Sequence, residues 1–291
     1  MKLTHSRAVA LMVLVTLMWS IAGVVTRHLE SARSFEVTFW RSFFTVLSLL
    51  VILPLWQGRA VFSRIRAGGS ALWVSGVCWS VMFTAFMVAL TLTSVANVLV
   101  TMSIGPLLTA LLARVFIGHL IAPRTWLAIG LAGVGVAWMY AGQMDLSDAM
   151  TGTLVALMVP LAGASNWTVV QYSRQHGKNV DLVPAVLVGA VISCMVTLPL
   201  SFPFSATSHD LSLLAMLGLF QLAIPCVLSV LCAGVLKAPE VSLLGLLEVI
   251  FGILLAWAGA SEVPGAHVMT GGALVIVALG LNELIGWRQK T

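Results

Sequence analysis

Two ionisable residues interrupt long apolar stretches of this sequence and are the first candidates for chemistry. Glu248 lies in the middle of the apolar run 239–259, and Arg41 lies near the start of the run 36–56. A charged side chain at the centre of a membrane costs about 2.5–3.5 kcal/mol on insertion scales, so it should face the protein interior or water. Glu248 is therefore a candidate proton site or counter-charge for a substrate amine. Arg41 is a candidate for attracting a substrate carboxylate.

Both residues also have a structural interpretation. Glu248 could be a protonated or hydrogen-bonded tie between helices. Arg41 could extend to the membrane interface, or it could pair with Glu30 or Glu36. The sequence leaves both interpretations open.

Aromatic residues form a second group of candidates. Trp79 and Phe83 share one helical face of the run 70–91 with Met82 and Phe86. Such a face would suit flat apolar or aromatic groups, because stacking and cation–π contacts are available there. The alternative is that these rings face lipid or the membrane interface.

Further candidates lie in the first and sixth apolar runs and in the eighth. Trp19 and Trp167 occupy nearly matching places in the two halves of the chain, and Asn166 precedes Trp167. Gln171 and Gln221 are polar groups inside apolar runs. They could contact a zwitterionic substrate or tie helices together.

The composition shows what kind of scaffold must hold these residues. The chain has 291 residues, of which 60% are hydrophobic and only 9% are charged, with a mean hydropathy of +1.06. Soluble domains are about 45–50% apolar and roughly 25% charged. These values exclude a soluble enzyme, a nucleic-acid-binding domain and a disordered chain. We expect an all-α integral membrane protein.

Ten apolar runs are long enough to be membrane helices, which need about 20 residues each. They leave no room for a folded soluble domain. The runs are 8–26, 36–56, 70–91, 94–117, 124–142, 151–172, 183–203, 211–235, 239–259 and 267–287.

Basic residues predict the orientation in the membrane. With the N-terminus in the cytoplasm, 12 of the 15 lysines and arginines fall on the cytoplasmic side, as the positive-inside rule requires. An even number of helices then returns the C-terminus to the cytoplasm. We expect a multi-pass protein of the cell (inner) membrane.

The two halves of the chain contain a repeated block. Residues 97–113 align without a gap to residues 240–256, at an offset of 143. The expected units are 1–145 and 146–291, with five helices each. Because five is an odd number, the second unit must enter the membrane upside down. Inverted repeats place a substrate site near the midplane and supply two related gates.

Three residues of the repeated block are candidates for these gates. Asn97 and Glu240 are the repeat-related pair that follows the tight turns, and Pro106 lies inside the fourth run. A proline frees a backbone carbonyl and allows bending. The alternative for Asn97 and Glu240 is helix capping beside a turn.

Several short motifs follow one another along the chain. They are Trp19-Ser20 with Gly23 and Arg27, Phe39-Trp-Arg41-Ser-Phe-Phe, Ser103-Ile-Gly-Pro106, Leu247-Glu248, and Ser261-Glu262. Their order and spacing resemble the drug/metabolite transporter superfamily and its EamA family, and the tryptophan-rich character is similar to YddG-type exporters of aromatic and other amino acids. The resemblance implies ten helices in two inverted five-helix repeats, and export of small metabolites.

The favoured function is a secondary carrier that exports amino acids, including aromatic ones, by alternating access. Its expected partners are an amino-acid-like substrate, membrane lipid and protons, and a monomer would suffice. The alternative is a multidrug or organic-cation exporter of the same superfamily. The small multidrug-resistance relatives place an essential Glu in their first helix, whereas residues 8–26 contain no acid.

Catalysis and cofactors are not expected. No cluster of His, Cys or Asp has the spacing of a metal site, and no nucleotide-binding loop motif occurs. The four cysteines lie in apolar segments and are expected to be small buried hydrophobes. Energy would come from an ion gradient, from exchange, or from the substrate gradient.

Overall fold

The computed structural model describes residues 3–32, 34–118, 146–175, 181–261 and 263–288, with a few positions between 123 and 138. Every regular element of these residues is helical, which confirms the predicted all-α class. The predicted helix 124–142 lies mostly outside the described residues.

The described residues of the first half of the chain form six helices up to Ile117. They are α1 (His5–Thr26), α2 (Ser34–Gln57), α3 (Val61–Ala67), α4 (Gly69–Leu92), α5 (Val95–Met102) and α6 (Gly105–Ile117).

The helices of the second half include one 3₁₀ turn and one π-helical segment. They are α8 (Leu146–Gln175), α9 (Pro184–Thr197), the 3₁₀ turn η1 (Leu198–Leu200), α10 (Ser208–Met216), the π-helical segment η2 (Leu217–Ala223), α11 (Ile224–Ala233), α12 (Ala238–Gly245), α13 (Leu247–Ala260) and α14 (Ala266–Arg288).

Seven helical stretches of the described residues are long and apolar enough to cross a membrane, where α5–α6, α10–η2–α11 and α12–α13 each count as one stretch. Two shorter apolar helices, Pro184–Leu200 and Ala266–Ala278, accompany them. These stretches support a multi-pass membrane protein. The total of ten spans stays a prediction.

The repeated sequence blocks have the same local structure. A break at Ser103 and Ile104 separates α5 from α6, and a break at Leu246 separates α12 from α13. α12 begins and ends 143 residues after α5, which is the offset of the sequence repeat. The residues that directly follow α6 and α13, Gly118 and Ser261, both adopt the left-handed conformation, with φ of 74° and 52°. The inversion of one half relative to the other stays a prediction.

The helices pack into two groups that each draw on both halves of the chain. α4, α6 and α8 pack together, as do α1, α11 and α13. We call α4, α5, α6 and α8 the first bundle, and α1, α11, α12 and α13 the second bundle. α2 contacts η2 and α9, and α9 contacts α4. Each of these contacts recurs with the roles of the two halves exchanged.

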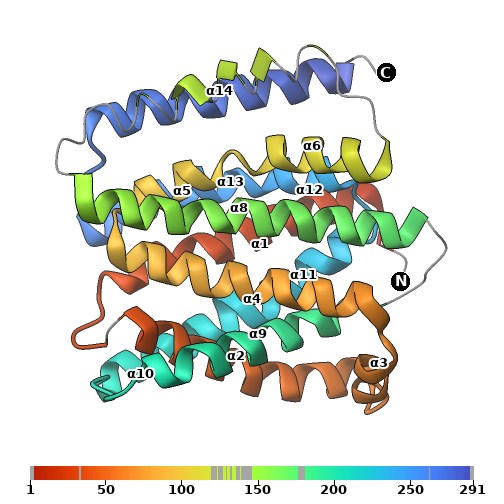
Figure 1. Cartoon of the computed structure of the whole chain (residues 1–291), viewed down its shortest axis with the longest axis vertical. Coiled ribbons are helices and arrows are strands. Elements are labelled where there is room, and N and C mark those ends of the chain that lie inside the picture. Colours follow the sequence, from red (N-terminus) through yellow and green to blue (C-terminus); the bar gives the residue numbers. More distant parts are fainter. Residues whose placement is uncertain are drawn as a thin grey trace.

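α1 begins and α14 ends at the same end of the molecule (Figure 1). We call this the near end, and the end where α1 finishes the far end. α3, with Arg64 and Arg66 in its last turn, lies at the near end, and α6 ends there after Arg114 (Figure 1). The clustering of basic residues at one end agrees with the predicted topology. Which side of a membrane this end faces stays a prediction.

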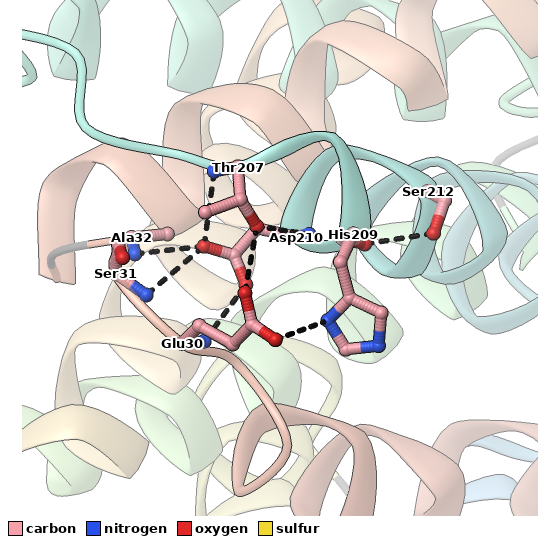
Figure 2. A network of polar contacts seen from close by, with 7 residues as sticks. All are labelled: Glu30, Ser31, Ala32, Thr207, His209, Asp210 and Ser212. Carbon is pink, nitrogen blue, oxygen red and sulfur yellow. Dashed lines mark hydrogen bonds and ion pairs between the residues drawn. The ribbon is translucent and has the colours of Figure 1, made fainter.

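A buried carboxylate fixes the far end. Asp210, in the first turn of α10, is fully buried and accepts backbone N–H groups from the loop between α1 and α2 (Figure 2). The N···O distances are 2.8 Å from Glu30, 3.1 Å from Ser31 and 3.0 Å from Ala32. Asp210 also caps its own helix in a reciprocal pair with Thr207. The loop after α1 is thereby joined to the start of α10.

A second carboxylate strengthens this joint. Glu36, in the first turn of α2, is 1% exposed and accepts the backbone N–H groups of Ser205 and Ala206 at 2.8–3.0 Å. Backbone N–H groups that are buried away from water need partners inside the protein, and these two acids supply them.

We predict that Asp210→Ala lowers the free energy of unfolding by about 3 kcal/mol or more, because several buried N–H groups lose this acceptor. Thermal unfolding of the purified protein in detergent would measure the change. Asp181→Ala is the matched control, since Asp181 is partly exposed, lies 3.6 Å from Arg64 and accepts one N–H, from Val183. The control should lose about 1 kcal/mol or less. Equal losses in the two variants would contradict the structural role of Asp210.

Candidate functional site

A cavity lies between the two bundles, beside the breaks of α5–α6 and α12–α13. Its volume is about 140 Å³, far more than the roughly 10–15 Å³ that one water needs. Gly105 and Pro106 line it from the first break, and Gly245 and Leu246 from the second. Its wall is mainly apolar and aromatic, with few polar groups, as in typical small-molecule sites.

Eight of the twelve predicted site residues line this cavity. They are Trp19, Arg41, Trp79, Phe83, Pro106, Trp167, Gln221 and Glu248.

Arg41 is the cationic side chain of the cavity. It is fully buried, and its Nη1 donates to Gln221 Oε1 at 3.1 Å while its Nη2 donates to the Phe83 carbonyl oxygen. Its Nε has no hydrogen-bond partner among the described residues. Arg41 is buried inside the protein and makes no ion pair with Glu30 or Glu36 in the described part of the chain. Glu36 bonds to the backbone of the α9–α10 loop instead.

A glycine lets Arg41 reach this depth. Gly218 lies directly against α2, and a Cβ added there would come within 2.9 Å of the carbonyl oxygen of Arg41. The Thr45 hydroxyl donates to the Gly218 carbonyl oxygen at 3.1 Å across the same contact. Gly218 belongs to the π-helical η2, a distortion that is frequent at functional sites. η2 also carries Gln221, so it positions the partner of Arg41.

Glu248 is the anionic side chain of the cavity. It is 8% exposed, and its carboxyl group makes no hydrogen bond or ion pair with any described residue. It lies in the first turn of α13, directly after the break at Leu246. The prediction placed Glu248 in mid-helix. The break instead puts it at a helix N-terminus, where the dipole favours an anion. The absence of a partner there disfavours a hydrogen-bonded tie between helices.

The predicted aromatic face is internal. Trp79 and Phe83 are each 3% exposed and Trp167 is 8% exposed, so the lipid-facing alternative is wrong for these rings. Trp79 meets Trp167 edge to face, with 5.8 Å between ring centroids and 90° between planes. Trp79 comes from the first half of the chain and Trp167 from the second. Trp19 lines the cavity from α1, and its carbonyl oxygen accepts from Gln221 Nε2 at 3.4 Å.

The other four predicted residues bind helix ends or neighbouring helices and do not line the cavity. Asn97 Nδ2 donates to Thr93 Oγ1 at 3.0 Å. Asn166 Oδ1 accepts from the Ser75 hydroxyl at 2.6 Å. Gln171 Oε1 accepts the backbone N–H of Ala238 at 3.1 Å, at the start of α12.

Glu240 is the fourth of these residues. Its Oε2 accepts the backbone N–H of Lys237 at 3.0 Å and lies 3.6 Å from His5 Nε2. This is the capping alternative that the sequence left open. Asn97 does not cap α5 itself. The capping residue is Ser94, whose hydroxyl accepts the Asn97 backbone N–H.

Sequence reasoning missed several cavity residues. Met12, Leu99 and Ser242 were not predicted, and Cys226 was predicted only as a buried hydrophobe. A signal for two of them existed, because Leu99 and Ser242 stand 143 residues apart in the repeated block.

One cluster of two acidic residues and a histidine, among the described residues, lies close enough together to hold a metal ion. Ligand atoms of Glu30, His209 and Asp210 lie within 4.8 Å of one another (Figure 2). Both carboxylate oxygens of Asp210 already accept backbone N–H groups. The cluster is therefore explained by its structural role at the far end.

Comparison with known proteins finds a matching family and several similar solved structures. Residues 6–141 match the EamA-like transporter family. A solved structure titled "Crystal structure of protein" is similar over 97% of this chain and 99% of its own, with 17% sequence identity and a TM-score of 0.65. At this identity the similarity shows the fold alone. No curated protein matches the chain.

We predict that Arg41→Met leaves the free energy of unfolding within about 1 kcal/mol of the original protein, because a buried cation without an anionic partner is costly and an apolar side chain of similar volume removes that cost. Thermal unfolding in detergent would measure it beside Asp210→Ala. A loss as large as that of Asp210→Ala would mean that Arg41 serves the fold and not the cavity.

Proposed function

We propose that this chain is a secondary transporter that exports amino acids, including aromatic ones, across the cytoplasmic membrane, because residues 6–141 match the EamA-like transporter family. Transport proceeds by alternating access, with the near end in the cytoplasm. The family match supports the transporter class, and the substrate and the direction of transport go beyond it.

One observation carries the substrate class: Arg41 and Glu248 line the same apolar cavity. A zwitterionic amino acid presents a carboxylate and an ammonium group, and each needs an opposite charge when it leaves water. The guanidinium of Arg41 suits the carboxylate, and the carboxylate of Glu248 suits the ammonium group. No described hydrogen bond or ion pair joins Arg41 to Glu248, and Arg41 bonds to neutral acceptors, so neither charge neutralises the other.

The remaining cavity wall suits an apolar or aromatic side chain. Trp79, Phe83 and Trp167 supply ring faces and edges, and Trp19 adds a further ring. Aromatic pairs add about 0.5–1.5 kcal/mol beyond the area that they bury. These rings favour a side chain such as that of phenylalanine over a charged one.

The broken helices support alternating access. Discontinuous helices at the midplane are a common feature of carriers built from inverted repeats, because their free ends can face a substrate. Here both breaks border the cavity, and they lie at equivalent positions of the repeated blocks. We propose that 1–145 and 146–291 are the two inverted units.

The organic-cation alternative is less well supported. A cation exporter would use Glu248 alone, and Arg41 would repel its substrate from the same cavity. A comparison of phenylalanine with phenethylamine, which lacks the carboxylate, separates the two functions.

We predict that proteoliposomes containing the protein show saturable counterflow of L-phenylalanine, with phenethylamine at least about tenfold weaker because it loses the charge-assisted bonds to Arg41. Arg41→Gln should remove this preference by weakening phenylalanine and leaving the amine unchanged or improved. If phenethylamine is the better substrate and no amino acid exchanges, the cation exporter replaces the amino acid exporter.

We predict that Glu248→Gln abolishes the pH dependence of transport between pH 5 and 8, because the amide cannot take up or release a proton. Initial rates of counterflow, with and without a pH gradient, would measure it. Glu30→Gln is the control, since this exposed acid lies at the far end and does not line the cavity. A pH response in Glu248→Gln that equals that of the original protein would exclude the proton role.

A further inference from the structure

Two arginines make the same contact in the two halves of the chain. Arg27, which follows α1, donates from Nη1 to the carbonyl oxygen of Leu90 at 3.1 Å and from Nη2 to that of Thr93 at 3.0 Å. Arg174, in the last turn of α8, donates from Nη1 to the carbonyl oxygens of Ala233 at 2.8 Å and Leu236 at 3.3 Å.

The acceptors are equivalent by the repeat. Leu90 and Ala233 are 143 residues apart, and so are Thr93 and Leu236. Each arginine thus donates hydrogen bonds to the tight turn that precedes a broken helix. The broken helix is α5–α6 in one half and α12–α13 in the other. α1 finishes at the far end and α8 at the near end, so the two contacts lie at opposite ends of the molecule (Figure 1).

The chemistry of these contacts is favourable. The last carbonyl groups of a helix have no partner within that helix. Leu90 lies in the last turn of α4, and Ala233 is the last residue of α11. A guanidinium group satisfies such carbonyls and also complements the negative end of the helix dipole. A charged donor makes these bonds stronger than neutral ones.

Both arginines join the first bundle to the second. Arg27 reaches from α1 of the second bundle to α4 of the first, whereas Arg174 reaches from α8 of the first bundle to α11 of the second. The cavity lies between these bundles. A separation of the bundles at either end would therefore break the arginine contact of that end.

Two further contacts nearer the cavity also join the two bundles at repeat-equivalent positions. Leu99 of α5 packs on Gly252 of α13, where an added Cβ would overlap the leucine side chain. Thr109 of α6 donates to the Ser242 hydroxyl of α12 at 3.3 Å. Leu99 and Ser242 are 143 residues apart, as are Thr109 and Gly252. The two crossings between the bundles are thus equivalent in position and different in chemistry.

We propose that Arg27 and Arg174 are the latches of two gates, at the far end and the near end, and that opening one end releases its latch while the other stays engaged. The inference rests on the alternating access of the proposed transporter. Both arginine contacts are present in this structure.

Cys226 provides a reporter for each gate, because it lines the cavity and is 1% exposed. In a variant with Cys78→Ala, Cys194→Ala and Cys232→Ala, Cys226 is the one remaining thiol. A membrane-impermeant maleimide is then applied to right-side-out and to inverted vesicles, and the rate of labelling is measured from each side without substrate.

Arg27→Gln should raise the labelling rate from the side of the far end, by roughly tenfold for the loss of one charge-assisted contact. Arg174→Gln should raise it from the opposite side by a similar factor. Arg27→Lys and Arg174→Lys should give smaller changes in the same directions, and they serve if a glutamine variant does not fold. Arg64→Gln is the control for a lost near-end charge, since Arg64 pairs with Asp181 at the surface, and it should leave both rates unchanged.

The opposite directions are the decisive result. If both arginine variants raise labelling from the same side, or if neither changes it in folded protein, the latch proposal is overturned. The labelling needs no substrate, so reciprocal shifts in a protein without amino acid counterflow would support the latches and reject the substrate. Counterflow without reciprocal shifts would reject the latches alone.

Discussion

Every backbone N–H and C=O group inside a bilayer needs a partner from the protein, because lipid offers none. This constraint shapes the structure wherever a helix is interrupted. The breaks between α5 and α6 and between α12 and α13 are buried against the other bundle and the cavity, and not exposed to lipid. The exposed helix ends obey the same constraint. Asp210 and Glu36 satisfy N–H groups at the far end, and Arg27 and Arg174 satisfy carbonyl groups at the two tight turns.

The same low-polarity interior gives the few polar groups of the cavity their importance. Arg41 is held by two neutral acceptors, and Glu248 by no described partner. Each charge is therefore left to be compensated by something else, which for Glu248 is a proton or a ligand. The mainly apolar and aromatic lining of the cavity lowers the local dielectric constant, which strengthens the effect of both charges on a bound molecule.

The sequence predicted the parts of the structure that depend on the cost of placing a residue in lipid. Apolar runs became helices, and Arg41, Glu248, Trp79 and Trp167 turned inward. It did not separate Gln221 from Gln171, because both are amides in apolar runs. Gln221 faces Arg41, and Gln171 caps the start of α12. That difference arises from the π-helical turn of η2 and from the direction of the neighbouring helix, which no local pattern contains. The contacts of Arg27 and Arg174 could not be predicted from the sequence either, since every residue has a backbone carbonyl group and no residue type identifies these acceptors.

The equivalence of Arg27 and Arg174 has a thermodynamic consequence. In the proposed gates, each end loses a guanidinium contact to two carbonyl groups when it opens, so these two contacts by themselves favour neither open form. A protein with two open forms of similar free energy has no preferred direction of its own, because a ligand shifts such an equilibrium only through its different affinities for the two forms. In the proposed transporter, the concentrations on the two sides of the membrane would then decide which way the substrate flows.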